Sequence, residues 1–463
     1  MWLTHRKIMK SKSSNKIFYI SFSAILLLAV LHSCDIDSRH EFECLNTNPH
    51  NVTIEDALEN LNSALDLING GTKSPISAEI ANVRLITPFD LPLDTKSQSG
   101  QNDFEQLVYV VDFEDEQGFA VLGADDRFVP VLVITEQGSS PKNIVDPPSL
   151  DPGTTSPDGL TLDQLYCEED DEYYLGGNED MVGTLISDYI VKIMNGGVNP
   201  PGMDDGSDPN PGDDDPTNPG EDIPGGGTDY TIVPALLNTK WSQNYPFNSD
   251  ITHTDFWGQP RPIGCTTTAT IQILAYLKNV SLENKFGITN STWYDIENCE
   301  YGLANDPQLS SDLAVLGKKA ADGIGVIYNF AFSGQTFATP SAAKRYLKSL
   351  GYSGAKTNIG YSLTKIKNML KLRKPVLIGA LPSNIKGHAW VIDGIYEQRN
   401  TSYPANKQTL LHCNWGWGGN ADGYYESELF DLTQGAVMFD DKDTGSSDTR
   451  NMSDWWWFRI VTY

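Results

Sequence analysis

A segment of low complexity in the middle of the 463-residue chain divides it into two parts. Residues 200–227 consist largely of proline, glycine and aspartate, and such a composition buries too little apolar surface to fold. We therefore expect an acidic linker over residues 200–228, between one domain over residues 34–199 and another over residues 229–463. The aspartates lack the terminal glutamate and flanking helices of a calcium-binding EF-hand loop.

The linker also suggests how the chain is processed. Exposed linkers are the places where proteases cut, and a compact module, a cleavable linker and a second domain are the arrangement of a zymogen. Composition alone fits equally well two domains that stay joined by a permanent spacer.

The first 33 residues have the pattern of a targeting segment. Basic residues precede an apolar run over residues 17–31, which is short for a membrane span. The run ends in Leu31-His32-Ser33-Cys34, which resembles a bacterial lipobox with His32 in place of the usual small residue. We expect lipidation of Cys34 and an exported cell-envelope protein, at the outer membrane or cell surface, with later release as a secreted form left open. An ordinary secretory signal is the alternative.

The first domain reads as a small α+β module. Apolar residues recur at helical spacing early and late in it, and three β-rich runs lie between them. The expected helices span residues 51–68 and 181–194, and the expected strands span residues 107–111, 119–122 and 129–134. No catalytic constellation is evident in this module.

In the second domain, helical signals come first and strand signals last, which indicates an α+β layout. The expected helices span residues 265–278, 311–322, 340–350 and 362–374. The expected strands span residues 376–379, 389–395, 409–415 and 456–461.

The cysteines point to a free thiol. With Cys34 assigned to lipid, an odd number remains, so at least one stays unpaired within the chain; these are Cys44, Cys167, Cys265, Cys299 and Cys413. Pairing of Cys299 with Cys413 is left open. Cys265 follows Gly264 at the start of a predicted helix, where unpaired N–H groups and the helix dipole favour a thiolate. The alternative is a buried cysteine that caps a core helix.

A catalytic thiolate needs a base, a group that orients the base and donors for an oxyanion. The second domain contains three histidines. His388 lies at the start of a predicted strand and is free to face a cleft, whereas His412 lies inside a strand and His253 in a polar loop. His388 is therefore the candidate base.

Four motifs occur together and in order. They are Trp241 to Asn248, Gly264 to Ala269, Gly387 to Val391, and Asn414 to Gly419 with Asp422 to Tyr425. This set resembles the streptopain family of papain-like cysteine peptidases. Residues 52–57 and 118–127 resemble that family's propeptide. The resemblance implies a papain-like α+β catalytic domain, with a helical part and an antiparallel sheet part, preceded by a small α+β propeptide domain.

The resemblance also implies roles for individual residues. Cys265 would be the nucleophile and His388 the base and later the acid, resting as a thiolate–imidazolium pair. Gln243 and the backbone N–H of Cys265 would bind the oxyanion. Asn414 would hold the imidazole, through its side chain or its backbone, and Trp415 would shelter the histidine's hydrogen bond from water.

The resulting hypothesis is the zymogen of an exported, lipid-anchored bacterial cysteine endopeptidase. Its partners would be a protein or peptide substrate, its own propeptide as inhibitor, and a membrane through the N-terminal lipid. No cofactor or metal is expected, and the net charge of −28 argues against nucleic acid. The alternatives are an acyl transferase or amidase with the same dyad, and an inactive papain-like surface binding or inhibitor protein.

Overall fold

The computed structural model describes most of the two predicted domains. The described ranges are residues 48–71, 76, 78–90, 103–141 and 144, part of 182–194, and residues 228–255, 257–299, 306–330, 335–380, 388–400, 407–430 and 459–463. Cys34, Cys44, Cys167, the targeting segment and residues 200–227 of the linker lie outside them.

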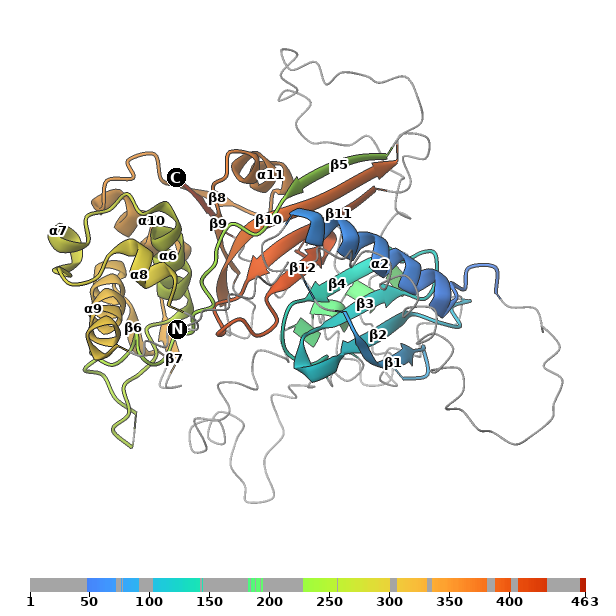
Figure 1. Ribbon diagram of the computed structural model, residues 1–463, viewed down its shortest axis with the longest axis horizontal. Helices are drawn as coiled ribbons and strands as arrows, with labels where there is room; N and C mark the ends of the chain where they lie inside the picture. The colour runs from blue at the N-terminus through green and yellow to red at the C-terminus, as the bar shows by residue number, and fades with distance from the viewer. Residues whose placement is uncertain are drawn as a thin grey trace, which may run out of the picture. The chain divides into compact units, whose positions relative to one another are not determined.

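The N-terminal module is an antiparallel sheet covered by a helix. Its elements are α2 (Ile54–Gly71), β1 (Ile80–Ile86), β2 (Val108–Phe113), β3 (Phe119–Gly123) and β4 (Val131–Thr135), with the strands in sequence order. The apolar stripe of α2 packs on one face of this sheet, where Leu61 and Ile68 join a buried cluster with Val111 and Leu122 (Figure 1). On the other face, described helical residues of the predicted helix 181–194 join the main core, and Tyr189 contacts Phe128.

The helical part of the second domain is built around one buried helix. Its elements are α6 (Cys265–Leu277), α7 (Leu282–Phe286), α8 (Trp293–Glu297), α9 (Pro307–Ile324), β6 (Ile327–Phe330), β7 (Gln335–Phe337) and α10 (Pro340–Ser349). Every residue of α6 from Thr266 to Ala275 is buried. Because α8, α9 and α10 all pack against it, α6 has no polar face, which explains why its sequence is apolar and threonine-rich.

The remaining elements form the sheet part. They are β5 (Thr228–Val233), β8 (Lys356–Ile359), α11 (Leu363–Lys371), β9 (Val376–Ala380), β10 (His388–Asn400), β11 (Lys407–Asn414), β12 (Gly423–Glu426) and β13 (Arg459–Thr462). The strand order is β12-β11-β10-β9-β13-β8, and β5 pairs with β10. α6 packs against β10, so the start of α6 and the start of β10 meet where the helical and sheet parts join.

One continuous sheet connects the N-terminal module with the second domain. β4 pairs antiparallel with β12, with Ile134 opposite Tyr424 and Thr135 opposite Gly423. Strands on either side of the predicted linker thus belong to the same sheet, although residues 200–227 themselves are not described. The expected α+β class, with antiparallel strands in both domains, is confirmed. The elements that the sequence did not predict are α7, α8, β1, β5, β6, β7, β8 and β12.

Candidate active site

Cys265 is the first residue of α6. Gly264 precedes it with a φ of 87°, and its carbonyl oxygen accepts hydrogen bonds from the N–H groups of Thr267 and Thr268. A Cβ at position 264 would lie 3.3 Å from Oγ1 of Thr336, so both the conformation and the available space favour glycine. The thiol is partly exposed and has the helix-terminus position expected for a reactive cysteine.

His388 is the first residue of β10, and its ring is held by a backbone oxygen. Nε2 lies 2.9 Å from the carbonyl oxygen of Trp415. Because a carbonyl only accepts, Nε2 carries the hydrogen, and in the neutral ring Nδ1 is then the basic nitrogen. The ring lies 4.8 Å from that of Trp417 and is parallel to that of Trp390 at 6.2 Å. The imidazole therefore has a fixed tautomer and an apolar setting.

The Cys265 thiol lies at the start of β10, the strand that begins at His388. The Cys265 thiol hydrogen-bonds the backbone of Ala389, the residue that follows His388. The fold thus places Cys265 next to the start of β10, where His388 lies 123 positions later in the sequence (388 − 265).

Burial acts on both groups in the direction of their neutral forms. It raises the pKa of the Cys265 thiol, an effect that the hydrogen bond to Ala389 opposes. It lowers the pKa of His388 to about 4, against the opposing hydrogen bond to Trp415. Both pKa directions oppose the thiolate–imidazolium pair expected from the sequence, which stays a prediction.

Gln243 is held beside the cysteine by its backbone. Its carbonyl oxygen accepts a hydrogen bond from the N–H of Ile263 at 2.9 Å, two residues before Cys265. The neighbouring Trp241 is buried, and its carbonyl oxygen accepts from the N–H of Gly418 at 3.0 Å. This segment therefore links the loop before Cys265 to the glycine-rich loop that follows β11, and it keeps the backbone of Gln243 near Cys265.

Asn414 acts on the histidine only indirectly. Its Oδ1 accepts from Nε2 of Gln272 at 2.9 Å and from the N–H of Gly416 at 3.2 Å, and its Nδ2 donates to the carbonyl oxygen of Thr239 at 2.7 Å. The group that orients His388 is instead the backbone carbonyl of the next residue. The sequence left open whether the side chain or the backbone of Asn414 holds the imidazole. The structure shows no direct contact of either kind, because the side chain of Asn414 fixes the loop instead.

Trp415 packs beside the histidine, and a residue that sequence reasoning did not single out holds it. Its ring is fully buried and packs 5.2 Å from that of Trp417 and 4.9 Å from that of Trp390. The backbone N–H of Trp415 donates to Oδ1 of Asp422 at 2.8 Å. Burial raises the pKa of Asp422 to about 7, against the opposing effect of this bond. Asp422 was visible in the sequence only as part of a family motif.

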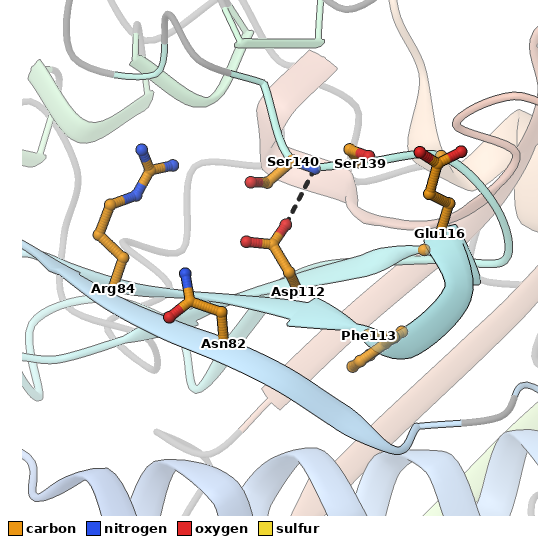
Figure 2. Close-up of a pocket in the computed structure, with 9 residues that line it drawn as sticks. Asn82, Arg84, Asp112, Phe113, Glu116, Ser139 and Ser140 are labelled. Atoms are coloured by element: carbon orange, nitrogen blue, oxygen red, sulfur yellow. Dashed lines mark hydrogen bonds between the residues drawn. The ribbon is translucent and has the colours of Figure 1, made fainter. Parts of the chain in front are cut away.

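Other chemistry-bearing features lie elsewhere. Cys299 and Cys413 are buried free thiols. A pocket of about 310 Å³ lies on the N-terminal module, where Arg84, Asp112 and Glu116 line it and Asp112 accepts from the N–H of Ser140 (Figure 2). It contains neither Cys265 nor His388.

Among the described residues, no cluster of three His, Cys, Asp or Glu side chains has metal-binding geometry. None of the helices in those ranges combines the length and hydrophobicity that spanning a bilayer requires.

Part of the second domain matches a family of known proteins. Residues 241–425 match the model of the peptidase C10 family, and that range runs from Trp241 to Tyr425, so it contains all five predicted site residues. The resemblance to the streptopain family is confirmed. Streptopain from Streptococcus pyogenes serotype M28 (strain MGAS6180) is 24% identical over 231 residues, which is 42% of this chain and 55% of the relative. Streptopain of serotype M1 is 23% identical over the same length.

These comparisons cover only part of the proteins concerned. The chain spans about half the length of the streptopains that it matches. Among solved structures, a fragment of Prevotella intermedia prointerpain A with a cysteine-to-alanine substitution is similar at a TM-score of 0.46 and 18% identity, over 77% of this chain and 95% of that one.

Proposed function

We propose that this chain is the zymogen of a cysteine endopeptidase. The observation that carries the proposal is the juxtaposition of Cys265, at the start of α6, with His388, whose Nδ1 is left basic by the Nε2 hydrogen bond to Trp415. A thiol beside an oriented neutral imidazole is the arrangement required for nucleophilic acyl transfer. The match to the peptidase C10 family model supports the class of bond, a peptide bond.

The proposed reaction uses this chain's own groups. Nδ1 of His388 takes the proton of the Cys265 thiol as the sulfur attacks the scissile carbonyl carbon. The developing oxyanion is bound by the backbone N–H of Cys265 and the side-chain amide of Gln243. The imidazolium then protonates the leaving amine as the C–N bond breaks, which leaves a thioester. Water, deprotonated by His388, hydrolyses the thioester and returns the proton to sulfur.

The pKa directions of the two groups depend on burial. Burial is the largest cause of both pKa shifts, so a rearrangement that admits water to the pair would lower the thiol pKa and raise that of the imidazole. In this proposal residues 34–199 are the propeptide, residues 229–463 the enzyme, and the acidic linker the region of cleavage. Cys34 would carry a lipid that anchors the exported precursor to the cell envelope.

The first prediction concerns Cys265→Ala in a chain of residues 35–463. The wild-type protein under reducing conditions should shorten with time, label with an epoxysuccinyl thiol reagent and cleave casein. Cys265→Ala should remain full length and lose at least about 10³-fold in cleavage rate, because no other group supplies the nucleophile. Mass spectrometry of the labelled protein and a fluorogenic casein assay measure both effects.

Cys299→Ala is the matched control, since it removes a buried thiol outside the site and should keep labelling and cleavage. Labelling without peptide cleavage would favour transfer chemistry or another amide substrate. Absence of labelling in the folded, processed wild-type protein would contradict the proposal and favour a binding protein.

A further inference from the structure

A short segment after β4 is clasped by the loop that leads into β12. The N–H of Glu136 donates to the carbonyl oxygen of Asp422 at 2.8 Å, and the N–H of Ala421 donates to that of Gln137 at 3.1 Å. A Cβ at Gly138 would lie 2.2 Å from Oδ1 of Asn420, so the two segments approach closely. The N-terminal module thus grips the same loop that positions Trp415.

Within this clasp, the Glu136 carboxylate bridges two cationic side chains of the second domain. Its Oε1 lies 3.2 Å from Nε2 of His412, and its Oε2 lies 3.3 Å from Nζ of Lys240. On its other side, Nδ1 of His412 lies 2.6 Å from Oδ1 of Asp393, whose Oδ2 accepts from the N–H of Leu237 at 2.8 Å. His412 is 4% exposed and Asp393 is 0% exposed.

The charges of this group are mutually dependent. Both ring nitrogens of His412 face carboxylate oxygens, which only accept, so the ring binds as an imidazolium with two donors. Burial alone lowers the pKa of His412, but the charge and hydrogen bond of Asp393, with those of Glu136, raise it well above 6.5. Burial raises the pKa of Glu136, yet the hydrogen bond and charge of His412, with Lys240, outweigh it and lower the net value.

We propose that Lys240, His412 and Asp393 form a carboxylate-binding site of the second domain, and that Glu136 is the ligand by which the N-terminal module is recognised and retained. The occupant is this segment of the chain itself, which would stay bound after the linker is cut. The inference extends the proposed function, because it names the contact that must break before the module leaves.

The position of the site explains how withdrawal of Glu136 would affect Cys265 and His388. Lys240 immediately precedes Trp241, whose carbonyl holds Gly418, and His412 lies two residues before Asn414, which fixes the loop at Gly416. Withdrawal of Glu136 would leave Lys240 and His412 with one carboxylate, Asp393, between them. Both chain segments that support the Trp415 loop would then lose a charged restraint together.

The retention should depend on pH. The Glu136 contribution is present above the ordinary carboxyl pKa and is lost as pH falls through its lowered value. The His412 contribution is present below 6.5 and is lost only as pH rises through its raised value. Asp422, with a pKa of about 7, and Tyr424 also face this group. Protonation of Asp422 removes its repulsion of Glu136, which favours retention, and its attraction of His412, which disfavours it. The two effects on retention therefore oppose each other.

The test uses the inactive Cys265→Ala chain of residues 35–463 with one specific protease site inserted into the linker. After nicking, surface plasmon resonance and size-exclusion chromatography follow release of the N-terminal fragment at pH 7 and in a series of steps below pH 4.5. We expect the parent fragments to stay together at pH 7 and to separate progressively faster as the pH falls below 4.5. Glu136→Gln, which keeps the shape and removes the charge, should speed release at pH 7 by about 30-fold or more.

Glu59→Gln is the matched control, since Glu59 is an exposed carboxylate on α2 of the same module and should leave release unchanged. Circular dichroism and thermal unfolding of the intact chains show whether each variant folds. Lys240→Gln, on the other side of the contact, provides a second test and should also accelerate release. Equal release rates for Glu136→Gln, Lys240→Gln and Glu59→Gln would overturn the proposal. Because the chain is catalytically inactive and the readout is binding, this result is independent of whether the peptidase assignment holds.

Discussion

The imidazole of His388 is controlled by a backbone oxygen rather than by a side chain. The carbonyl of Trp415 fixes the tautomer, Asp422 holds the N–H of Trp415, and Asn414 braces the adjoining loop. Every residue type has a backbone carbonyl that can accept this bond. The sequence therefore has to specify the path of the chain that brings the carbonyl of residue 415 to His388. The polar side chains around position 415 are therefore positioning residues.

At the residue scale, the titration of His388 in the precursor should report its burial. Burial lowers its pKa to about 4, so in Cys265→Ala precursor the ring should stay neutral well below pH 6.5. The unfolded chain then binds more protons between about 4 and 6.5, and stability should fall as pH falls through that window. NMR of the imidazole Cε1–H signal measures the pKa, with His388→Gln used to assign it. A precursor value at or above 6.5 would show that the site is already hydrated.

Among the elements, β12 joins the two halves and demands glycine at its first residue. A Cβ at Gly423 would lie 2.3 Å from the carbonyl oxygen of Ile134 in β4. The two backbones cannot move apart without breaking the pairing of β4 with β12 at Thr135 and Tyr424. The close approach explains why a small residue is required in the middle of the sheet.

Gly423→Ala should therefore separate β4 from β12. We expect the Cys265→Ala precursor to lose about 1–3 kcal/mol or more of unfolding free energy, as overpacking typically costs, together with faster release of the module after nicking. Urea denaturation measures the first effect. The control is Gly351→Ala, where φ is also positive at 114° but a Cβ would have no atom within 4 Å. Equal losses in both variants would mean that backbone conformation, not contact with β4, is decisive.

For the whole molecule, the continuous sheet makes the N-terminal module part of the second domain's architecture. The β4–β12 ladder, the α2 layer and the Glu136 contact all lie on described residues of one connected unit. Cleavage of the linker alone would leave every one of these contacts in place. Processing and activation are therefore expected to be separate steps.

The location of the whole protein depends on the segment before the module. If the run that ends at Cys34 is a lipobox, as we propose, the wild-type precursor made in a bacterial host should incorporate labelled palmitate and partition with membranes. Cys34→Ala should remove both properties and leave a protein of unchanged peptidase activity, because lipidation requires the thiol. Detergent phase partitioning measures the difference. Membrane association that persists without palmitate label in the wild type would contradict the proposal.

Sequence by itself determined the class of fold and named the candidate residues for the chemistry. The Gly264-Cys265 pair at a helix start, His388 at a strand start and the alternating apolar runs are local patterns, and local patterns are set by helix and strand periodicity. The strands of residues 119–122 and 376–379 were found for this reason. The short elements α7 and β12 were missed because a few residues carry too little periodic signal.

Tertiary structure decided what no local pattern encodes. That the oxygen of Trp415, not the side chain of Asn414, orients His388 follows from loop geometry. That the pKa of Cys265 is raised and that of His388 lowered follows from burial, which depends on what packs around them. The pairing of Glu136 with Lys240 and His412 joins residues more than 100 positions apart across a sheet edge. The physical reason is the same in each case: hydrogen bonds, charges and desolvation act through space, and only the folded chain fixes those distances.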